Sequence, residues 1–434
     1  MQYVQLTSTC FSDVLGASGL DRGRFKADLK RTKLVLETIR ETYADGSSSL
    51  LHLSEQTDDI VALETIAARY RDHFEHVVIL GTGGSSLGGQ MLCSLAVPSA
   101  SPRVNEPDLH FFANIDPHSI SAMLNRLPQS RTGYLVVSKS GSSVETITQF
   151  LICLEAVKVD VGQLKVAKHF TAITEPGENP LRSIAIKHNI AVLDHDPNIG
   201  GRYSALSLVG LLPAMISGLD VRALRAGAAD VLRPVLKDDD PENIEPAIGA
   251  AISVGLAVEN TVSSTVMMPF VDRLEKFGLW YRQLWAESLG KDGKGTTPIT
   301  AMGTVDQHSQ LQLYLDGPSD KLFTLIMLSC SGDGPFIDPK ISIDEKISYL
   351  SGKSVGDLMD AGQRATAETL IRNRRPTRIF KINDLDEATM GAMMMHFILE
   401  TIIAAHLFGV NPFDQPAVEE IKTLAQEYLV GQAR

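Results

Sequence analysis

Cysteine is scarce in this chain. Its 434 residues include only Cys10, Cys93, Cys153 and Cys330, and no two of them stand in a C-x-x-C spacing. A cysteine-based zinc site and a disulfide framework both need cysteines that are paired or grouped, so neither is expected here. This sparse use of cysteine fits a reducing compartment, and we expect a cytoplasmic location.

Positive charge is also in short supply. The 40 lysines and arginines are outnumbered by 52 aspartates and glutamates, which gives a formal net charge of −12, and no stretch is rich in Lys or Arg. Such a surface repels nucleic acid and anionic membranes. We therefore expect no nucleic-acid partner and no membrane partner, and any bound phosphate must be held by local groups.

The sequence shows neither the pattern of a targeting signal nor that of a P-loop nucleotide-binding motif. The first residues, Met1–Gln5, show no basic region followed by an apolar core, and we expect no run that reaches the length of a membrane span. The P-loop pattern G-x-x-x-x-G-K-[ST] does not occur, which excludes a P-loop kinase or ATPase. What is present is an ordinary globular composition, with 44% hydrophobic and 21% charged residues.

Short apolar runs alternate with longer amphipathic stretches along the chain. This alternation predicts an α/β fold, with mostly parallel sheets that carry helices on both faces. We expect strands at residues 76–80, 108–115, 133–138, 169–174, 190–194, 263–270 and 321–329. The main expected helices lie at residues 25–43, 60–74, 274–289 and 386–408.

The length of the chain exceeds what one hydrophobic core usually supports, so we expect more than one domain. The predicted organisation is a helical lead-in over residues 1–75, a first doubly wound domain over 76–235, a second over 236–410, and a helical segment over 411–434. The polar stretch at 237–241 is the expected passage between the two domains.

Two loops rich in glycine and hydroxyl side chains follow expected strands. They are Gly81–Ser86 (GTGGSS) and Ser138–Ser143 (SKSGSS). Backbone N–H groups, hydroxyls and a helix N-terminus can hold an anion, at the sheet edge where open α/β sheets bind ligands. One such loop could equally be a solvated turn, but two at successive strand ends favour a phosphorylated metabolite. A dinucleotide site is less favoured, because Ser86 stands where G-x-G-x-x-G needs its third glycine.

Candidate acid and base residues lie in the later half of the chain. Gln283 and Glu287 are four residues apart in an expected helix and share one face of it. A glutamate can act as a general base, although this segment alone would suit an ordinary surface carboxylate. His308 follows a glycine-containing break, and histidine exchanges protons near neutral pH. Gln415 and Lys422 are about two helical turns apart, on one face.

Six segments, in this order, resemble motifs of the phosphoglucose isomerase family, whose members have the sugar isomerase (SIS) fold. They are GTGGSSLG (81–88), SKSGSSVET (138–146), GGRYS (200–204), QLWAESLGK (283–291), GTVDQHS (303–309) and FDQPAVEEIK (413–422). The resemblance implies two SIS domains and a C-terminal segment that returns to the active site. It also implies reversible isomerisation of glucose 6-phosphate and fructose 6-phosphate, through ring opening and a cis-enediol, with no metal and no organic cofactor.

The same resemblance implies a role for individual residues. Glu287 would move a proton between C2 and C1, and Arg202 would stabilise the developing negative charge. His308 and Lys422 would assist ring opening. The implied substrate-binding residues are Gly84, Ser85, Ser138, Lys139, Ser140, Ser143, Gly201, Gln283 and Gln415. In this family the ring-opening histidine comes from the partner subunit, which implies a homodimer.

Two other functions stay open at this point. A non-catalytic sugar-phosphate sensor on the same fold would keep the two loops, but it would have no use for Glu287, His308 and Lys422 together. A related isomerase could also accept mannose 6-phosphate. Val305 and Asp306 replace the more usual small and polar pair before Gln-His, so the range of substrates is not decided by the motifs.

Overall fold

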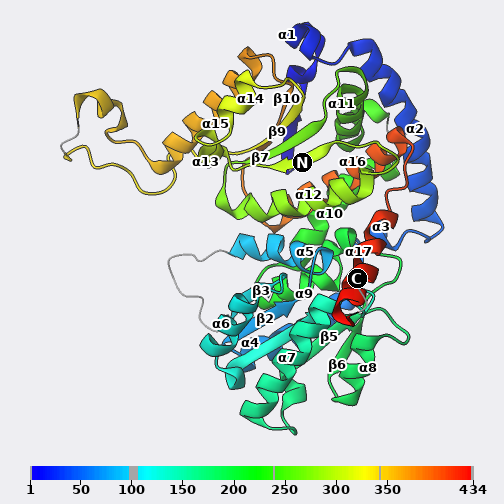
Figure 1. Ribbon diagram of the computed structural model, residues 1–434. Helices are drawn as coiled ribbons and strands as arrows, with labels where there is room; N and C mark the ends of the chain where they lie inside the picture. Colours follow the sequence, from blue (N-terminus) through cyan, green and yellow to red (C-terminus); the bar gives the residue numbers. More distant parts are fainter. Residues whose placement is uncertain (1, 97–105, 238–239, 342–343, 432–434) are drawn as a thin grey trace.

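The computed structural model (Figure 1) describes residues 2–96, 106–237, 240–341 and 344–431. It contains two five-stranded sheets with helices packed around them, which confirms the expected α/β fold. The expected passage at 237–241 lies partly outside the described residues.

The α-helices are α1 (Ser12–Leu15), α2 (Arg22–Ala44), α3 (Ser49–His52), α4 (Asp58–His73), α5 (Gly84–Cys93), α6 (Pro117–Arg126), α7 (Val144–Val161), α8 (Pro180–Lys187), α9 (Leu208–Ile216), α10 (Val221–Leu236), α11 (Glu245–Glu259), α12 (Glu275–Leu289), α13 (Gly303–Gln307), α14 (Leu311–Asp316), α15 (Val355–Arg372), α16 (Glu387–Phe408) and α17 (Glu419–Leu429).

The first sheet is parallel throughout. Its strands are β2 (His76–Leu80), β3 (Asp108–Phe112), β4 (Thr132–Val137), β5 (Phe170–Thr174) and β6 (Ala191–Asp194), in the order β3-β2-β4-β5-β6. Val77 and Ile79 pack with α4 and α5 on one face, whereas Val78 and Leu80 pack with α6, α7 and α8 on the other. Burial on both faces explains why the central strands are continuous apolar runs that the sequence alone could predict.

The second sheet is mixed. Its strands are β1 (Tyr3–Leu6), β7 (Ser264–Pro269), β8 (Thr297–Thr300), β9 (Lys321–Leu328) and β10 (Thr377–Ile382), in the order β1-β10-β9-β7-β8. Only β1 runs antiparallel to its neighbour. The sequence predicted β7 and β9 but missed β1, β8 and β10. In β10 the reason is Arg378, a charged residue that is buried because Glu400 of α16 pairs with it at 2.8 Å.

The N-terminal region contacts both halves of the molecule. Its strand β1 completes the second sheet, and the hydroxyl of Tyr3 bonds Nδ1 of the buried His396 at 2.6 Å. Helix α2 packs against α11 and α16, whereas Tyr70 of α4 donates a hydrogen bond to the Tyr134 carbonyl of the first sheet. The lead-in is therefore not purely helical as predicted, because four residues of strand pattern at its start find a partner only in β10.

Helix α16 forms the core of the second half. It packs against α10, α11 and α12, and nearly all of its side chains are buried. By length and composition it is apolar enough to cross a membrane, so the prediction that no run reaches that length is wrong for this segment. Its burial within the protein accounts for the apolar composition, since a helix enclosed on all sides has no solvent-facing stripe.

Candidate active site

The two glycine-rich loops lie at the same edge of the first sheet. One follows β2 and the other follows β4, and these strands are parallel neighbours, so their carboxyl ends meet. A 3-10 helix, η6 (Gly201–Leu206), follows β6 and packs against α5. This is the edge at which open α/β sheets bind ligands, as the sequence predicted.

Glycine is required where the first loop meets η6. A Cβ atom on Gly84 would lie 2.1 Å from the carbonyl carbon of Gly201, which no side chain allows. The Ser204 hydroxyl lies at the same contact, where it donates to the Gly201 carbonyl at 2.7 Å and is 3.3 Å from the Gly84 carbonyl oxygen. Gly83 adopts a φ of +57°, and a Cβ there would come 3.0 Å from Nε2 of Gln283. The close approaches bring α5, η6 and α12 together around one point.

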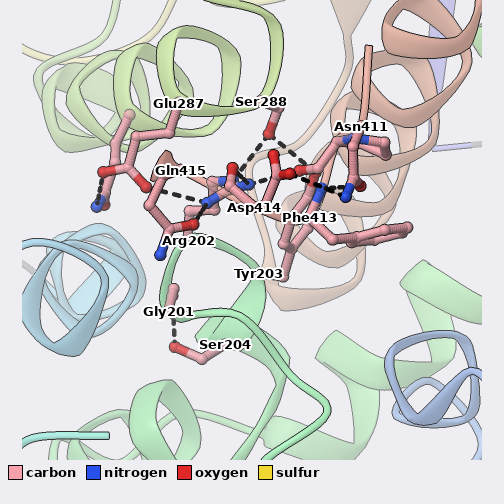
Figure 2. A network of polar contacts seen from close by, with 12 residues as sticks. Gly201, Arg202, Tyr203, Ser204, Glu287, Ser288, Asn411, Phe413, Asp414 and Gln415 are labelled. Carbon is pink, nitrogen blue, oxygen red and sulfur yellow. Dashed lines mark hydrogen bonds and ion pairs between the residues drawn. The ribbon is translucent and has the colours of Figure 1, made fainter. Parts of the chain in front are cut away.

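Arg202 is the centre of this arrangement, as Figure 2 shows. Its side chain is almost completely buried, and each of the five N–H donors of a guanidinium has a protein acceptor. Nε donates to Ser288 Oγ at 2.8 Å, and Nη1 donates to Glu287 Oε2 at 3.2 Å and Gln415 Oε1 at 2.8 Å. Nη2 donates to the carbonyls of Pro412 at 2.5 Å and Asp414 at 3.1 Å. A buried cation therefore stands directly beside a carboxylate.

Glu287 reaches this cation from the last turn of α12. Its Oε2 faces Arg202, while its Oε1 accepts a hydrogen bond from Gln283 Nε2 at 2.9 Å, as the i, i+4 spacing predicted. One third of the Glu287 side chain is exposed, so one side of the carboxylate remains accessible. Gln283 Oε1 is buried and has no hydrogen-bond partner among the described residues.

A short segment of the C-terminal region completes the site. Residues Asn411–Gln415, which we call the strap, follow α16 and lie across the end of α12 and the guanidinium of Arg202. Tyr203 donates its hydroxyl to the Pro412 carbonyl at 3.0 Å, and its ring lies 5.6 Å from that of Phe413. Burial raises the pKa of Tyr203, so its hydroxyl stays protonated and remains a donor.

The serine-rich loop leads into α7 on the first sheet. Ser138 is buried and donates to Ser143 Oγ at 3.2 Å, and Ser140 bonds the exposed Ser142 at 2.9 Å. Ser143 is the N-cap residue of α7, and its hydroxyl makes no capping hydrogen bond. One turn into the helix, the hydroxyl of Thr146 is buried and has no partner among the described residues. This loop therefore offers several serine hydroxyls that bond one another, and a helix N-terminus whose N-cap side chain makes no capping hydrogen bond.

Three predicted site residues lie apart from this cluster or point elsewhere. Lys139 directs its ammonium to the Pro197 carbonyl at 2.8 Å and to Glu175 at 3.3 Å, not to the serines. His308, the residue after α13, is exposed and makes no side-chain hydrogen bond with another described residue. Lys422 is 66% exposed on α17, and its one ion pair with a described residue is with Glu419, at 2.7 Å. Ser85, which is half-buried in the first turn of α5, does lie at the glycine-rich loop.

Comparison with known proteins identifies the family of this chain. The phosphoglucose isomerase family matches residues 39–319, which include the whole first sheet and every segment singled out above except the one at 413–422. The chain belongs to the phosphoglucose isomerase family. A probable glucose-6-phosphate isomerase of Methanococcus maripaludis is 34% identical over 423 residues, which cover 96% of this chain and 92% of that protein. The glucose-6-phosphate isomerase of Rubrobacter xylanophilus is 37% identical over 88% of this chain and 89% of its own length.

Solved structures resemble this member of the phosphoglucose isomerase family over most of its length. A hypothetical protein from Thermus thermophilus has a TM-score of 0.83 at 30% identity, over 94% of this chain and 98% of that one. A glucose-6-phosphate isomerase from Chlamydia trachomatis has a TM-score of 0.70 at 23% identity, over 85% and 72% of the two chains. At that lower identity the second likeness shows the fold, which is the predicted sugar isomerase fold.

Sequence reasoning missed the residues that hold the site together. Ser288 and Tyr203 adjoin predicted residues, and Lys291 ends one of the family motifs, but none of them was given a role. Pro412 and Asp414 act through backbone carbonyls, which every residue possesses. Adjacency within a motif was therefore the one signal that could have identified the first three, and no signal pointed to the carbonyls.

Proposed function

We propose that this protein catalyses the reversible isomerisation of D-glucose 6-phosphate and D-fructose 6-phosphate by ring opening and a cis-enediol proton transfer. The observation that carries the proposal is the accessible carboxylate of Glu287 held beside the buried guanidinium of Arg202. The enzyme would act in the cytoplasm, in keeping with its free cysteines. A coupled assay that follows glucose 6-phosphate formed from fructose 6-phosphate tests the proposal, and a purified, folded protein without turnover would refute it.

The chemistry assigns a different task to each part of the pair. Glu287 takes the proton from C2 of the open-chain aldose and returns it to C1, so one base serves both steps. The enediolate oxygens formed between these steps carry negative charge, which the Arg202 cation stabilises in a site of low polarity. Because Nη1 divides its two donors between Glu287 and Gln415, a substrate oxygen can replace the Gln415 amide oxygen without separating Arg202 from the base.

The phosphate would be held by Ser138, Ser140 and Ser143 at the N-terminus of α7. A dianion suits this position because the helix dipole and unused N–H groups favour negative charge. The buried hydroxyl of Thr146, which has no partner among the described residues, would donate to one of the phosphate oxygens. The Lys139 ammonium pairs with Glu175 and does not point to the serines. Lys139 would therefore favour phosphate binding through its positive charge in the loop and not through a direct bond. Binding of the phosphate then positions the carbons that react.

Replacement of one loop hydroxyl should weaken phosphate binding. Ser143→Ala removes a hydroxyl that caps no N–H group of α7 but accepts from the buried Ser138 hydroxyl, so we expect the free energy of unfolding to fall by about 1 to 3 kcal/mol. We expect the KM for fructose 6-phosphate to rise about tenfold or more, the value of a hydrogen bond to a charged group. Steady-state kinetics with Ser142→Ala, an exposed serine of the same loop, provides the matched control. An unchanged KM in Ser143→Ala would argue that the phosphate binds elsewhere.

Ring opening would be assisted by His308 and Lys422, and it requires a second copy of the chain. His308 is exposed, and among the described residues of one chain its side chain makes no hydrogen bond to Glu287. Exposed apolar side chains lie on α13, on α14 and in the described residues 329–341 and 344–354, which project from the body in Figure 1. They include Val305, Leu313, Phe336, Ile341, Ile347 and Tyr349. An exposed apolar surface of this kind favours a protein interface, and we propose a homodimer in which His308 enters the partner's site.

Mixed dimers test this arrangement directly. Glu287→Gln and His308→Ala chains, each impaired alone, are co-expressed with different tags and the mixed dimer is assayed. If His308 crosses the interface, one of the two sites in each mixed dimer is intact, and a random mixture should regain about a quarter of wild-type activity. Activity no higher than the average of the two separate variants would show that His308 acts within its own chain or not at all.

A further inference from the structure

The strap needs hydrogen-bond donors from outside itself. Residues Asn411–Gln415 form neither helix nor strand, so their carbonyls cannot be paired within a regular element. Arg202 and Tyr203 supply donors for the Pro412 carbonyl, and Arg202 supplies one for the carbonyl of Asp414. The Asn411 side chain donates to Asp414 Oδ2 at 3.1 Å, which leaves the Asn411 carbonyl and Asp414 Oδ1 to another group.

That group is Lys291, two residues beyond the last residue of α12. Its ammonium bonds the Asn411 carbonyl, pairs with Asp414 Oδ1 at 3.0 Å, and donates to the Ser288 carbonyl at 3.1 Å. These three acceptors match the three donors of an ammonium group. The Lys291 side chain is only 11% exposed, although the loop around it is open. The neighbouring ammonium also lowers the pKa of Asp414, which keeps that carboxylate charged.

Lys291 and Arg202 thus hold different groups of one short segment. Arg202 binds the part that carries Gln415, next to Glu287, and Lys291 binds the part where the chain leaves α16. Both side chains also bind Ser288. Arg202 donates to the Ser288 hydroxyl, and Lys291 donates to the Ser288 carbonyl. Because Ser288 follows Glu287 directly, the strap and the carboxylate are fixed relative to the same residue of α12.

We propose that Lys291 is a positioning residue that fixes the strap, and through it Gln415, against Arg202 and Glu287. Lys291 itself does not touch the substrate. The proposal rests on the isomerase function proposed above, and it extends that function to a residue whose contacts are all with the C-terminal segment and the end of α12. Loss of Lys291 should leave the serine-rich loop intact, since that loop lies on the first sheet and, among the described residues, shares no hydrogen bond or ion pair with the strap.

The kinetic consequence is a change in kcat rather than KM. We expect Lys291→Met to lower kcat about tenfold or more, because small displacements of orienting groups are costly, and to change the KM for fructose 6-phosphate less than about threefold. The matched control is Lys294→Met, which removes the same charge three residues further along the chain. The Lys294 side chain is exposed and forms no ion pair with a described residue. Equal kinetics of the two variants would overturn the proposal.

A double-mutant cycle then separates positioning from general damage. If Lys291 acts through Gln415, the variant that combines Lys291→Met with Gln415→Ala should have a kcat no lower than the more impaired single variant. Effects that simply multiply would show that Lys291 acts by another route. Thermal unfolding of each variant identifies any that fail to fold.

Hydrogen exchange tests the strap without any turnover. Amide exchange of the peptide covering residues 411–418 should become faster in Lys291→Met and stay unchanged in Lys294→Met, while α16 keeps its protection in both. Unchanged exchange in Lys291→Met would refute the role of Lys291 even in an active enzyme. A wild-type protein without isomerase activity would refute the proposed function instead, and the exchange experiment would still decide whether Lys291 holds the strap.

Discussion

Glu287→Gln should bind fructose 6-phosphate with nearly unchanged affinity and should lose isomerase activity by about 10³-fold or more, the scale expected for loss of a general base. The amide is almost the same size as the carboxylate but cannot accept the proton from C2. Calorimetric titration with fructose 6-phosphate and the coupled assay measure the two quantities on one preparation.

The structure indicates that this substitution leaves the fold intact. The amide oxygen of the new side chain can still accept from Arg202 Nη1. Its nitrogen would meet the Nε2 donor of Gln283, but rotation of the Gln283 amide presents Oε1, which is buried and has no partner among the described residues. The variant therefore exchanges one hydrogen bond for another, and the Gln283 amide atom that is left without a partner changes from Oε1 to Nε2.

Glu275→Gln is the control for this prediction. Glu275 begins the same helix, α12, but it is about half exposed, and within the described part of the chain it pairs with the neighbouring Lys276 alone. Its replacement should leave turnover within about twofold of wild type, since exposed ion pairs contribute little. A Glu287→Gln enzyme that keeps a tenth or more of wild-type turnover would remove Glu287 from its assigned role.

Arg202→Met should damage both stability and activity. A methionine side chain would lie in the same buried space, but it has none of the five N–H donors of the guanidinium. Five acceptors therefore lose a partner, and they belong to Glu287, Gln415, Ser288 and two strap carbonyls. We expect the free energy of unfolding to fall by about 3 to 5 kcal/mol, as for removal of one member of a buried ion pair. Urea denaturation measures this change.

Activity of Arg202→Met should fall further than the loss of stability explains. At a temperature where the variant is folded, we expect kcat to be lower by about 10² to 10³-fold, because a preorganised charge beside the developing enediolate is missing. Arg222→Met is the control, since Arg222 is about half exposed and pairs with the exposed Glu64. A folded Arg202→Met enzyme with wild-type kcat would show that the cation is structural only.

Whether a strand could be predicted from the sequence depended on where the residues that stabilise it lie in the chain. Strands such as β2 and β4 are buried on both faces, so their composition alone identified them. Strand β10 was missed since its Arg378 is compensated by Glu400, a residue 22 positions away on α16. Strand β1 was missed since its partner lies at the other end of the chain, near residue 380. In each failure, the stabilising partner is distant in sequence.

The candidate site divides in the same way. The spacing of Gln283 and Glu287 predicted that they share a helix face, and the structure joins them at 2.9 Å. The motifs also named Arg202 and Gln415, but nothing in their spacing indicated that one guanidinium nitrogen binds both Glu287 and Gln415. His308 and Lys422 stay predictions, because neither reaches Glu287 within a single described chain.

The amino-acid sequence by itself determined the α/β class, the central strands, the two loops rich in glycine and hydroxyl groups, and the family, because periodicity, composition and motifs are local properties of neighbouring residues. Tertiary structure alone decided that the strap crosses α12, that all donors of Arg202 are occupied, and that Lys291 binds the carbonyl of Asn411. The physical reason is that these acceptors are mainly backbone oxygens. Every residue carries one, so only the path of the folded chain determines which of them meets a buried cation.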